Sequence, residues 1–334
     1  MSRYLITGGL GFIGAGLANA LGKDGHQVRI LDNLSTGRRD SVTTSCEVVI
    51  GDVNDRALVG EAMSGVDGCF HLATTNESSG RNSDDLGCNN LQGMINVLSA
   101  AKNNAGKSPV PVAYASSSIT YGDNAHTSLN EDVSARPLTS AAADKAGIEL
   151  RARVATLAHG IPTTGLRLFS IYGHTPHPAT PENGVIAMFM ERIMNGQAIT
   201  IYGNGEQTRD FVYLADVVNF FTTAMSISPR HPAIYNVCTG RQASIQQLAH
   251  MLFSLCGKPV EIHYAPARKG DIRSSVGNPE LAIRHLGLRA RTTLADGLKQ
   301  MLTRHSSRTA VGNRSAAAGN DHHHTMIKLS PATT

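Results

Sequence analysis

The chain has 334 residues, of which 41% are hydrophobic and 17% charged, which indicates a soluble globular protein and excludes disordered and fibrous classes. Its net charge of +4 is spread without a basic block, so no nucleic-acid partner is expected. The five cysteines form no CxxC pair, and MSRYLITGG is too short an apolar run for a signal peptide or a membrane span. We therefore expect a cytoplasmic location, reduced thiols and no membrane partner.

Short β-rich runs alternate with amphipathic helical stretches through the first two-thirds of the chain. This alternation predicts an α/β fold with a doubly wound parallel sheet and helices on both faces. The predicted strands are Tyr4–Thr7, Val28–Leu31, Glu47–Ile50, Cys69–Ala73, Val110–Ser116 and Thr163–Leu168, and the predicted helices are Ile13–Leu21, Leu91–Ala105 and Ala141–Ala158.

The pattern changes after about Ser170, where loops lengthen and elements of mixed type follow. The predicted elements are a helix at Val185–Asn195, a strand at Ile199–Tyr202 and a helix at Leu214–Ser226. We expect a first domain over residues 1–170, a smaller mixed α/β C-terminal lobe mainly over residues 171–305 with the chain crossing back after residue 200, and a disordered tail over residues 306–334. The three consecutive histidines of that tail do not by themselves indicate a metal site.

A glycine motif, TGGLGFIG, follows the first predicted strand and opens the first predicted helix. Gly8, Gly11 and Gly14 permit a tight turn, close approach of a pyrophosphate, and packing of the helix on the strand. The helix N-terminus then offers free N–H groups to the phosphates. This placement predicts a Rossmann-type dinucleotide-binding domain over residues 1–170.

An acidic residue at the end of the second predicted strand indicates which dinucleotide is bound. Asp32 is expected to bond the adenosine ribose hydroxyls and to repel a 2′-phosphate, which favours NAD over NADP. Arg38 and Arg39 lie just downstream and could weaken that preference. Asp52 and Val53 follow the third strand, where the adenine is expected.

Motifs along residues 3 to 302 resemble the extended short-chain dehydrogenase/reductase family, and most of all its UDP-glucose 4-epimerase branch. They occur in the family's order: TGGLGFIG, DNLSTG, HLA, SSSITYG, LRLFSIYG, TIYGNGEQTRDFVYLADVV, YNVCTG and RKGDIR. The resemblance implies transient oxidation of a nucleotide sugar, with a tyrosine as the acid/base. A lysine four residues later on the same helical face lowers the phenol pKa, and a serine or threonine bonds the reacting hydroxyl.

The tyrosine position of this resemblance is Ala141, whereas Lys145 and Ser117 match the family's lysine and serine. Tyr121 and Tyr172 match the family's own YG positions, so neither is a displaced copy. Three interpretations remain open. Another group transfers the proton, such as Ser117, Thr139, Ser140, His174 or a water; or the protein binds its ligands without catalysis; or the alanine is an engineered change.

Other departures from the family narrow the reaction. Ser118 and Ile119 stand where the 4,6-dehydratases have Asp-Glu, and isoleucine transfers no proton, so dehydration is not favoured. Ser170 stands at the asparagine of the family's FNVYG motif, which indicates an altered sugar pocket. In the loop Thr74–Asp85, Glu77 and Arg81 are candidate sugar contacts or solvated loop charges.

The remaining site residues are implied by the resemblance. Cofactor contacts are expected from Gly8, Gly11, Phe12, Ile13, Gly14, Asp32, Asn33, Ser35, Thr36, Gly37, Asp52, Val53, Leu72, Ala73, Thr74, Asn90, Lys145 and Phe169. Substrate contacts are expected from Ser117, Ser118, Ser170, Val185, Ile201, Tyr202, Arg209, Arg268 and Asp271, with the two arginines bracketing the diphosphate.

Together these features predict an NAD-dependent nucleotide-sugar epimerase, acting on a UDP-hexose through a non-standard acid/base. The resemblance also implies a homodimer, formed by the helices predicted at Leu91–Ala105 and Ala141–Ala158. The alternative is a catalytically silent protein that binds NAD and a UDP-sugar, and a sugar-nucleotide dehydratase is less favoured.

Overall fold

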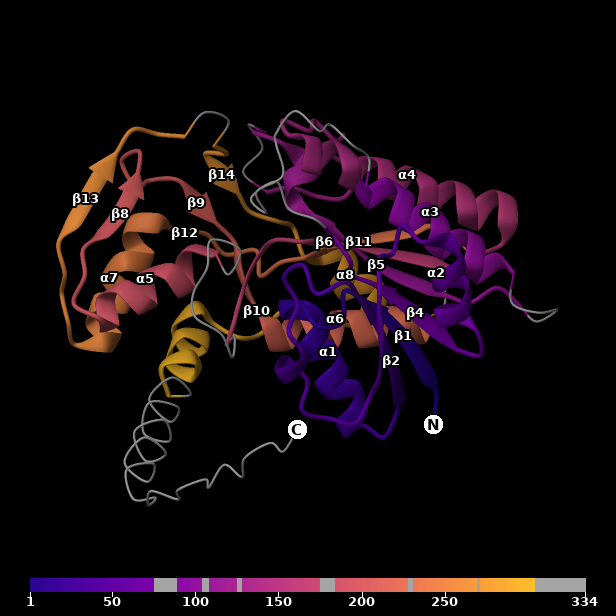
Figure 1. Ribbon diagram of the computed structural model, residues 1–334. Coiled ribbons are helices and arrows are strands. Elements are labelled where there is room, and N and C mark those ends of the chain that lie inside the picture. Colours follow the sequence, from indigo (N-terminus) through magenta and orange to yellow (C-terminus); the bar gives the residue numbers. More distant parts are fainter. Residues whose placement is uncertain are drawn as a thin grey trace, which may run out of the picture.

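A parallel sheet of seven strands is the centre of the part of the chain that the structure describes (Figure 1). The computed structural model describes residues 1–74, 89–103, 108–124, 128–174, 184–227, 231–268 and 271–303. The expected tail, the histidine run, Glu77 and Arg81 lie outside these residues. The strand order is β3-β2-β1-β4-β5-β6-β11, so the chain reverses direction across the sheet between β1 and β4. The strands are β1 Arg3–Thr7, β2 Gln27–Asp32, β3 Glu47–Ile50, β4 Gly68–His71, β5 Val112–Ser117, β6 Thr163–Leu168 and β11 Ala233–Val237.

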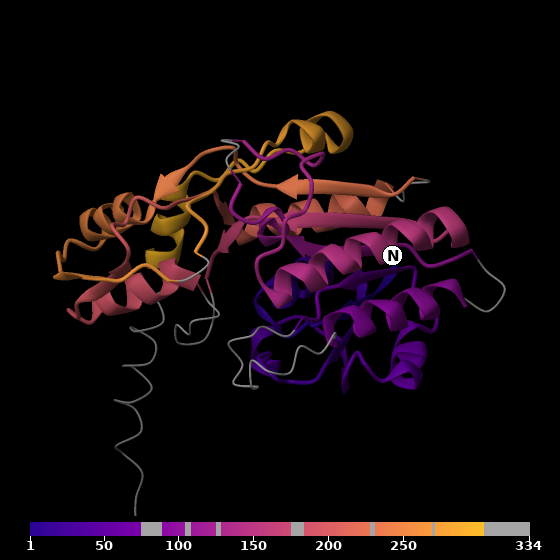
Figure 2. The same ribbon diagram turned by 90° about the horizontal axis from the view of Figure 1, so that it is seen from above.

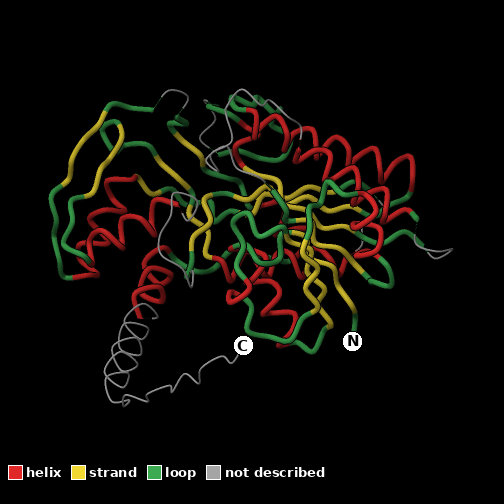
Figure 3. The backbone as a smooth tube through the Cα atoms, viewed as in Figure 1, coloured by secondary structure: helices red, strands yellow, loops and turns green. Residues whose placement is uncertain are grey.

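Helices cover both faces of this sheet, as Figure 3 shows by the red coils on either side of the yellow strands. One face carries α1 Phe12–Lys23, α6 Leu214–Ile227 and α8 Glu280–Leu286. The other carries α2 Arg56–Met63, α3 Asn89–Lys102 and α4 Ser140–His159. Adjacent residues of a strand point to opposite faces, so Leu5 and Ile6 of β1 belong to different hydrophobic clusters. The predicted doubly wound α/β fold is confirmed.

The ends of the helices follow from local sequence. Asp55 caps α2 by accepting from the N–H groups of Ala57 and Leu58, and Thr139 caps α4 by accepting from Ala142 N–H. At the other end of α4, Gly160 has a φ of 65°, a left-handed conformation that glycine adopts without a Cβ clash. Thr139 therefore sets where α4 begins, six residues before Lys145.

A smaller lobe of short strands and helices lies beside the end of the sheet at which the strands terminate (Figures 1 and 2). Two helices and a short strand, β8, of this lobe enclose its hydrophobic core. Its helices are α5 Gly184–Met194 and α7 Ile245–Cys256, and its strands are β8 Ile199–Tyr202, β9 Thr208–Arg209, β12 Ala243–Ser244, β13 Ile262–Ala265 and β14 Ser274–Ser275.

A parallel pair of short strands connects the two parts. β7 (Ser170–Tyr172) continues from β6 and pairs with β10 (Phe211–Tyr213), after which the chain enters α6 and returns to the large sheet through β11. This connection carries the chain from the large sheet into the smaller lobe and back again. No helix within the described residues has both the length and the apolar composition that crossing a membrane requires.

Candidate functional site

The glycine turn after β1 brings three backbone segments together. Gly8 has a φ of 69°, and a Cβ there would lie 2.7 Å from the backbone nitrogen of Ala73. A Cβ on Gly14 would lie 2.6 Å from Gly9 Cα and would overlap the Gly8 carbonyl oxygen. Gly11 differs, because the nearest atom to its Cβ would be 3.4 Å away. Gly8 and Gly14 are therefore required by the protein's own packing, whereas the space beside Gly11 is left for a ligand.

The first turn of α1 presents its amide groups beside this turn. Gly11 is the N-cap of α1, and no side chain within the described residues caps the helix start, which leaves N–H groups available to an anion. The turn lies at the end of β1, where the strand order reverses towards β4. Such a switch point is where ligands bind in open α/β sheets. This turn fits the pyrophosphate of a dinucleotide.

Asp32 ties the glycine turn to the next loop. Its carboxylate accepts from Leu10 N at 3.0 Å and from Leu34 N at 2.8 Å, and the side chain is only 7% exposed. Leu34 has a φ of 61°, a strained conformation for a residue with a Cβ, and this bond helps to hold it there. A carboxylate has about four lone-pair sites, so Asp32 keeps acceptor capacity for a ribose.

A hydrogen bond between a side-chain amide and a carboxylate joins the loops after β2 and β3. Asn33 Nδ2 donates to Asp52 Oδ2 at 3.1 Å, and Ser35 N donates to Asn33 Oδ1 at 3.0 Å. Asn96 of α3 donates to the carbonyls of Val53 and Asn54, which fixes the segment expected beside the adenine. Asn96 belongs to none of the sequence motifs, although it is a polar residue within the apolar stripe of α3.

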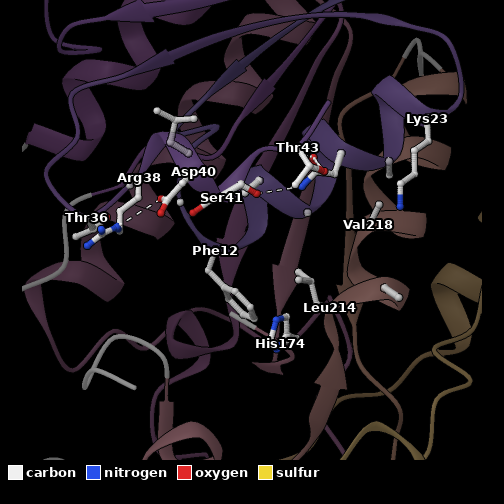
Figure 4. Close-up of a pocket in the computed structure, with 18 of the residues that line it drawn as sticks. Phe12, Lys23, Thr36, Arg38, Asp40, Ser41, Thr43, His174, Leu214 and Val218 are labelled. Atoms are coloured by element: carbon white, nitrogen blue, oxygen red, sulfur yellow. Dashed lines mark hydrogen bonds and ion pairs between the residues drawn. The ribbon is translucent and has the colours of Figure 1, made fainter. Parts of the chain in front are cut away.

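A groove of about 1060 Å³ runs from this loop along α1 towards α6 (Figure 4). Five residues expected to bind the cofactor line it: Gly11, Phe12, Ser35, Thr36 and Gly37. In Figure 4, Phe12, His174 and Leu214 lie close together, between Thr36 and Arg38 on one side and Lys23 on the other. His174 is thus placed on the α1 and α6 side of the sheet.

Lys145 lies against the strand β5. Its Nζ donates to the carbonyl oxygen of Ala115 at 3.0 Å. Burial lowers the pKa of Lys145 to about 8, although the charges of Asp144 and Glu149 act in the opposite direction. Lys145 therefore places a positive charge between α4 and the sheet. Its partner on β5, Ala115, lies two residues before Ser117.

His71, at the end of β4, is a buried and neutral neighbour of Lys145. Its Nδ1 lies 2.8 Å from Thr7 Oγ1, and its Nε2 has no partner among the described residues. Burial, and secondarily the charge of Lys145, lower the pKa of His71 to about 3. Near neutral pH this imidazole does not take up a proton.

Asp144 joins α4 to α3. Its Oδ2 accepts from Asn90 Nδ2 at 3.0 Å, and Asn90 Oδ1 accepts from the Thr74 hydroxyl at 3.3 Å. Thr74 is exposed and follows β4, so this chain of hydrogen bonds runs from the C-terminal end of a central strand to the residue preceding Lys145. Sequence analysis predicted Thr74 and Asn90 as site residues but did not consider Asp144.

A buried ion pair holds α4 onto the sheet. Arg167 of β6 donates to both carboxylate oxygens of Glu149, at 2.9 and 2.8 Å, and Ser116 donates to the same carboxylate. The Arg167 guanidinium also lies over the ring of Tyr121, 4.6 Å from its centroid. Because Glu149 is one turn after Lys145, this pair fixes the lysine along the strand.

The serines expected near the sugar lie at the end of β5, in the turn that follows it, and at the start of β7. Ser117 caps a short 3₁₀ turn by accepting from Ile119 N at 3.3 Å. Ser118 is buried and lies 3.4 Å from Ser275, oxygen to oxygen. The amide of Ser170 donates to the carbonyl of Asp210.

Two arginines of the smaller lobe are held by different contacts. Arg209 donates to Asp271 Oδ1 at 2.8 Å and to the carbonyl of Ile272 at 2.7 Å. The Arg268 guanidinium stacks on the Tyr202 ring, 3.9 Å from its centroid. Ile201, also expected to line the base site, is buried in the hydrophobic core of the lobe.

The family follows from comparison with known proteins. Residues 4–238 match the sequence profile described as the NAD dependent epimerase/dehydratase family, so the chain belongs to this family. The cofactor is NAD, and the glycine turn, the open start of α1 and Asp32 fit it.

Individual relatives are nucleotide-sugar enzymes. A UDP-glucose 4-epimerase of Mycolicibacterium smegmatis is 32% identical over 305 residues, covering 89% of this chain and 96% of the relative. A UDP-N-acetyl-alpha-D-glucosaminuronate decarboxylase of Bacillus cytotoxicus is 31% identical over 280 residues, covering 80% of this chain and 84% of that one. The structure of a Thermotoga maritima UDP-glucose 4-epimerase with UDP-glucose has a TM-score of 0.85 and 28% identity, covering 92% and 99% of the two chains.

Proposed function

We propose that the protein is an NAD-dependent epimerase of a UDP-hexose, with a non-standard acid/base. The observation that carries this proposal is the position of Lys145, whose ammonium group lies on β5 just before Ser117, at the end of the sheet that holds the glycine turn. The similarity to UDP-glucose 4-epimerases supports the choice of reaction and nucleotide.

The residues divide the chemistry as follows. NAD, when bound beside the glycine turn, would supply reversible hydride acceptance for the sugar carbon. Arg209 and Arg268 hold the diphosphate, since guanidinium groups make charge-assisted bonds with phosphate oxygens. Ser117 bonds the reacting hydroxyl, and Lys145 favours the negative charge that develops on it. Arg209 is already oriented by Asp271, which lowers the entropy cost of binding.

A homodimer is part of this proposal. Three apolar side chains of α4 are exposed at helical spacing: Leu150 (66%), Val154 (52%) and Leu157 (61%). Residues four and three apart lie on one face of a helix, so they form one apolar stripe. A second copy of the chain packing there would cover it.

Incubation of the purified protein with UDP-glucose tests the proposed reaction. Chromatography of the nucleotide sugars is expected to show conversion to the 4-epimer, and absorbance at the reduced-nicotinamide band is expected to show a transient signal. Calorimetry that detects UDP-glucose binding without either change would instead establish the catalytically silent alternative. If neither UDP-glucose nor NAD binds at millimolar concentration, both functions are wrong.

A further inference from the structure

We propose that Asp144 accepts and returns the sugar proton, in place of the tyrosine that position 141 lacks. This inference rests on the proposed epimerase function. The structural observation behind it is the juxtaposition of the Asp144 carboxylate with Lys145 and with the Thr74–Asn90 hydrogen-bond chain at the C-terminal end of β4.

The helix geometry places Asp144 beside the position of the missing phenol. Ala141, Asp144 and Lys145 are spaced i, i+3 and i+4 on α4, so they share one face of the helix. The next residue of that face, Ile148, is buried against the sheet. A carboxylate at 144 therefore starts within one turn of where a tyrosine would stand, on the same side of α4.

The carboxylate is held but retains an unused acceptor. Oδ2 accepts from Asn90, whereas Oδ1 accepts no hydrogen bond from any described residue. Asp144 is half-buried, so solvent and ligands can reach it. The charges of Asp144 and the adjacent Lys145 attract each other.

The other candidate groups fit the role less well. The Thr139 hydroxyl accepts from Ala142 N as the cap of α4, and the Ser117 hydroxyl accepts from Ile119 N; alcohols are also much weaker bases than carboxylates. His174 lies in the groove beside α1 and Leu214. The buried imidazole of His71 stays neutral.

In the proposed step, Asp144 exchanges one proton with the sugar hydroxyl in each direction of the reaction. Asp144 takes the proton as the O–H bond of the sugar breaks and the carbonyl bond forms; the C–H electron pair would leave as hydride, for which NAD would be the acceptor when bound. On return, the hydride adds to the other face of the carbonyl, and Asp144 gives the proton back to the oxygen. Because an aspartate is shorter than a tyrosine, a single water beside Ala141 carries the proton between them.

The variant Asp144→Asn tests the proposal, because the amide keeps the shape and cannot accept a proton. We expect its epimerisation rate to fall about 10²- to 10⁴-fold, the usual cost of losing a general acid/base. Calorimetry is expected to show UDP-glucose affinity within about threefold of the original chain. Asp132→Asn, which neutralises an exposed carboxylate on a loop, is the matched control and is expected to leave both values unchanged.

Chemical rescue separates proton transfer from a structural role. Addition of formate is expected to raise the epimerisation rate of Asp144→Ala at least tenfold, because a free carboxylate can occupy the space and accept the proton. The proposal is overturned if Asp144→Asn keeps its rate within threefold, if affinity falls in parallel with rate, or if formate has no effect. Absence of turnover by the unmodified chain refutes the proposed function itself, which distinguishes the two failures.

Discussion

At the scale of single residues, the function we propose depends on position 141, because that residue determines whether a phenol or another group transfers the proton. Lys145 and Ser117 are placed as a phenol on the same face of α4 would require, but an alanine methyl group has no proton to exchange. A tyrosine introduced at position 141 would meet the ammonium of Lys145 one turn later, and that charge would lower the pKa of the phenol.

We expect Ala141→Tyr to raise epimerisation at least about tenfold, because a general acid/base contributes about 10²- to 10⁴-fold and Asp144 supplies only part of that through a water. The double variant Ala141→Tyr with Asp144→Asn is expected to remain active, since the phenol no longer needs the carboxylate. The measurement is the steady-state epimerisation rate with UDP-glucose for the unmodified chain, the two single variants and the double variant. An inactive double variant would indicate that Asp144 positions the site instead.

A second residue-scale effect concerns pH and stability. The pKa of His71 is about 3 in the folded chain, against an unperturbed value of about 6.5. Between these values the unfolded chain binds a proton that the folded chain does not, so stability falls as the pH drops from 6.5 towards 3. We expect His71→Asn, which can still bond Thr7, to reduce the slope of stability against pH by up to about 1.4 kcal/mol per unit.

Urea denaturation at several pH values measures this slope, and the exposed His250→Asn is the control that should not change it. An unchanged slope in His71→Asn would show that the buried imidazole does not control acid sensitivity.

At the scale of secondary-structure elements, the turn between β1 and α1 separates packing from ligand binding. We expect Gly14→Ala to lower both stability and NAD affinity, because its Cβ would meet Gly9 Cα at 2.6 Å and push α1 from the turn. Gly11→Ala meets no atom closer than 3.4 Å, so it should fold normally while its methyl group obstructs the pyrophosphate. Thermal unfolding and NAD calorimetry on both variants test this, and equal destabilisation would contradict it.

The contact between α4 and β6 depends on a buried ion pair. Glu149→Gln leaves the guanidinium of Arg167 buried without its counter-charge, and we expect a loss of about 3–5 kcal/mol in the free energy of unfolding. Glu47→Gln is the matched control, because Glu47 bonds Arg29 from an exposed position and such a pair contributes about 0–1 kcal/mol. Chemical denaturation gives both values, and similar losses would refute the distinction.

At the scale of the whole molecule, the apolar stripe of α4 predicts the assembly. We expect Val154→Asp to convert a dimer into a monomer in sedimentation velocity, since it places a charge in the middle of the stripe formed with Leu150 and Leu157. Leu138→Asp, at an exposed apolar residue just before α4, should leave the dimer intact. A monomer at micromolar concentration in the unmodified chain would rule out the stripe as a dimer interface.

Much of the fold was predictable because local pattern determines it. The period of apolar residues placed β3, β6 and β8 at their observed bounds, and the glycine motif located the turn at the end of β1. The predicted strand boundaries were less accurate where the chain leaves the sheet at the end of a strand. The predicted strand Cys69–Ala73 ends at His71, because Ala73 packs instead against Gly8.

The sequence by itself determined the chemistry available: the glycine turn, Asp32, Lys145 and the lack of a phenol at 141 are all visible in the order of residues. Only the tertiary structure decided which groups meet. The bond between Asn90 and Asp144 joins residues 54 positions apart on two helices, and the burial of His71 beside Lys145 depends on strands and helices from separate parts of the chain. Helical and strand periods act over a few neighbours, whereas contacts across a sheet arise only when distant elements pack together.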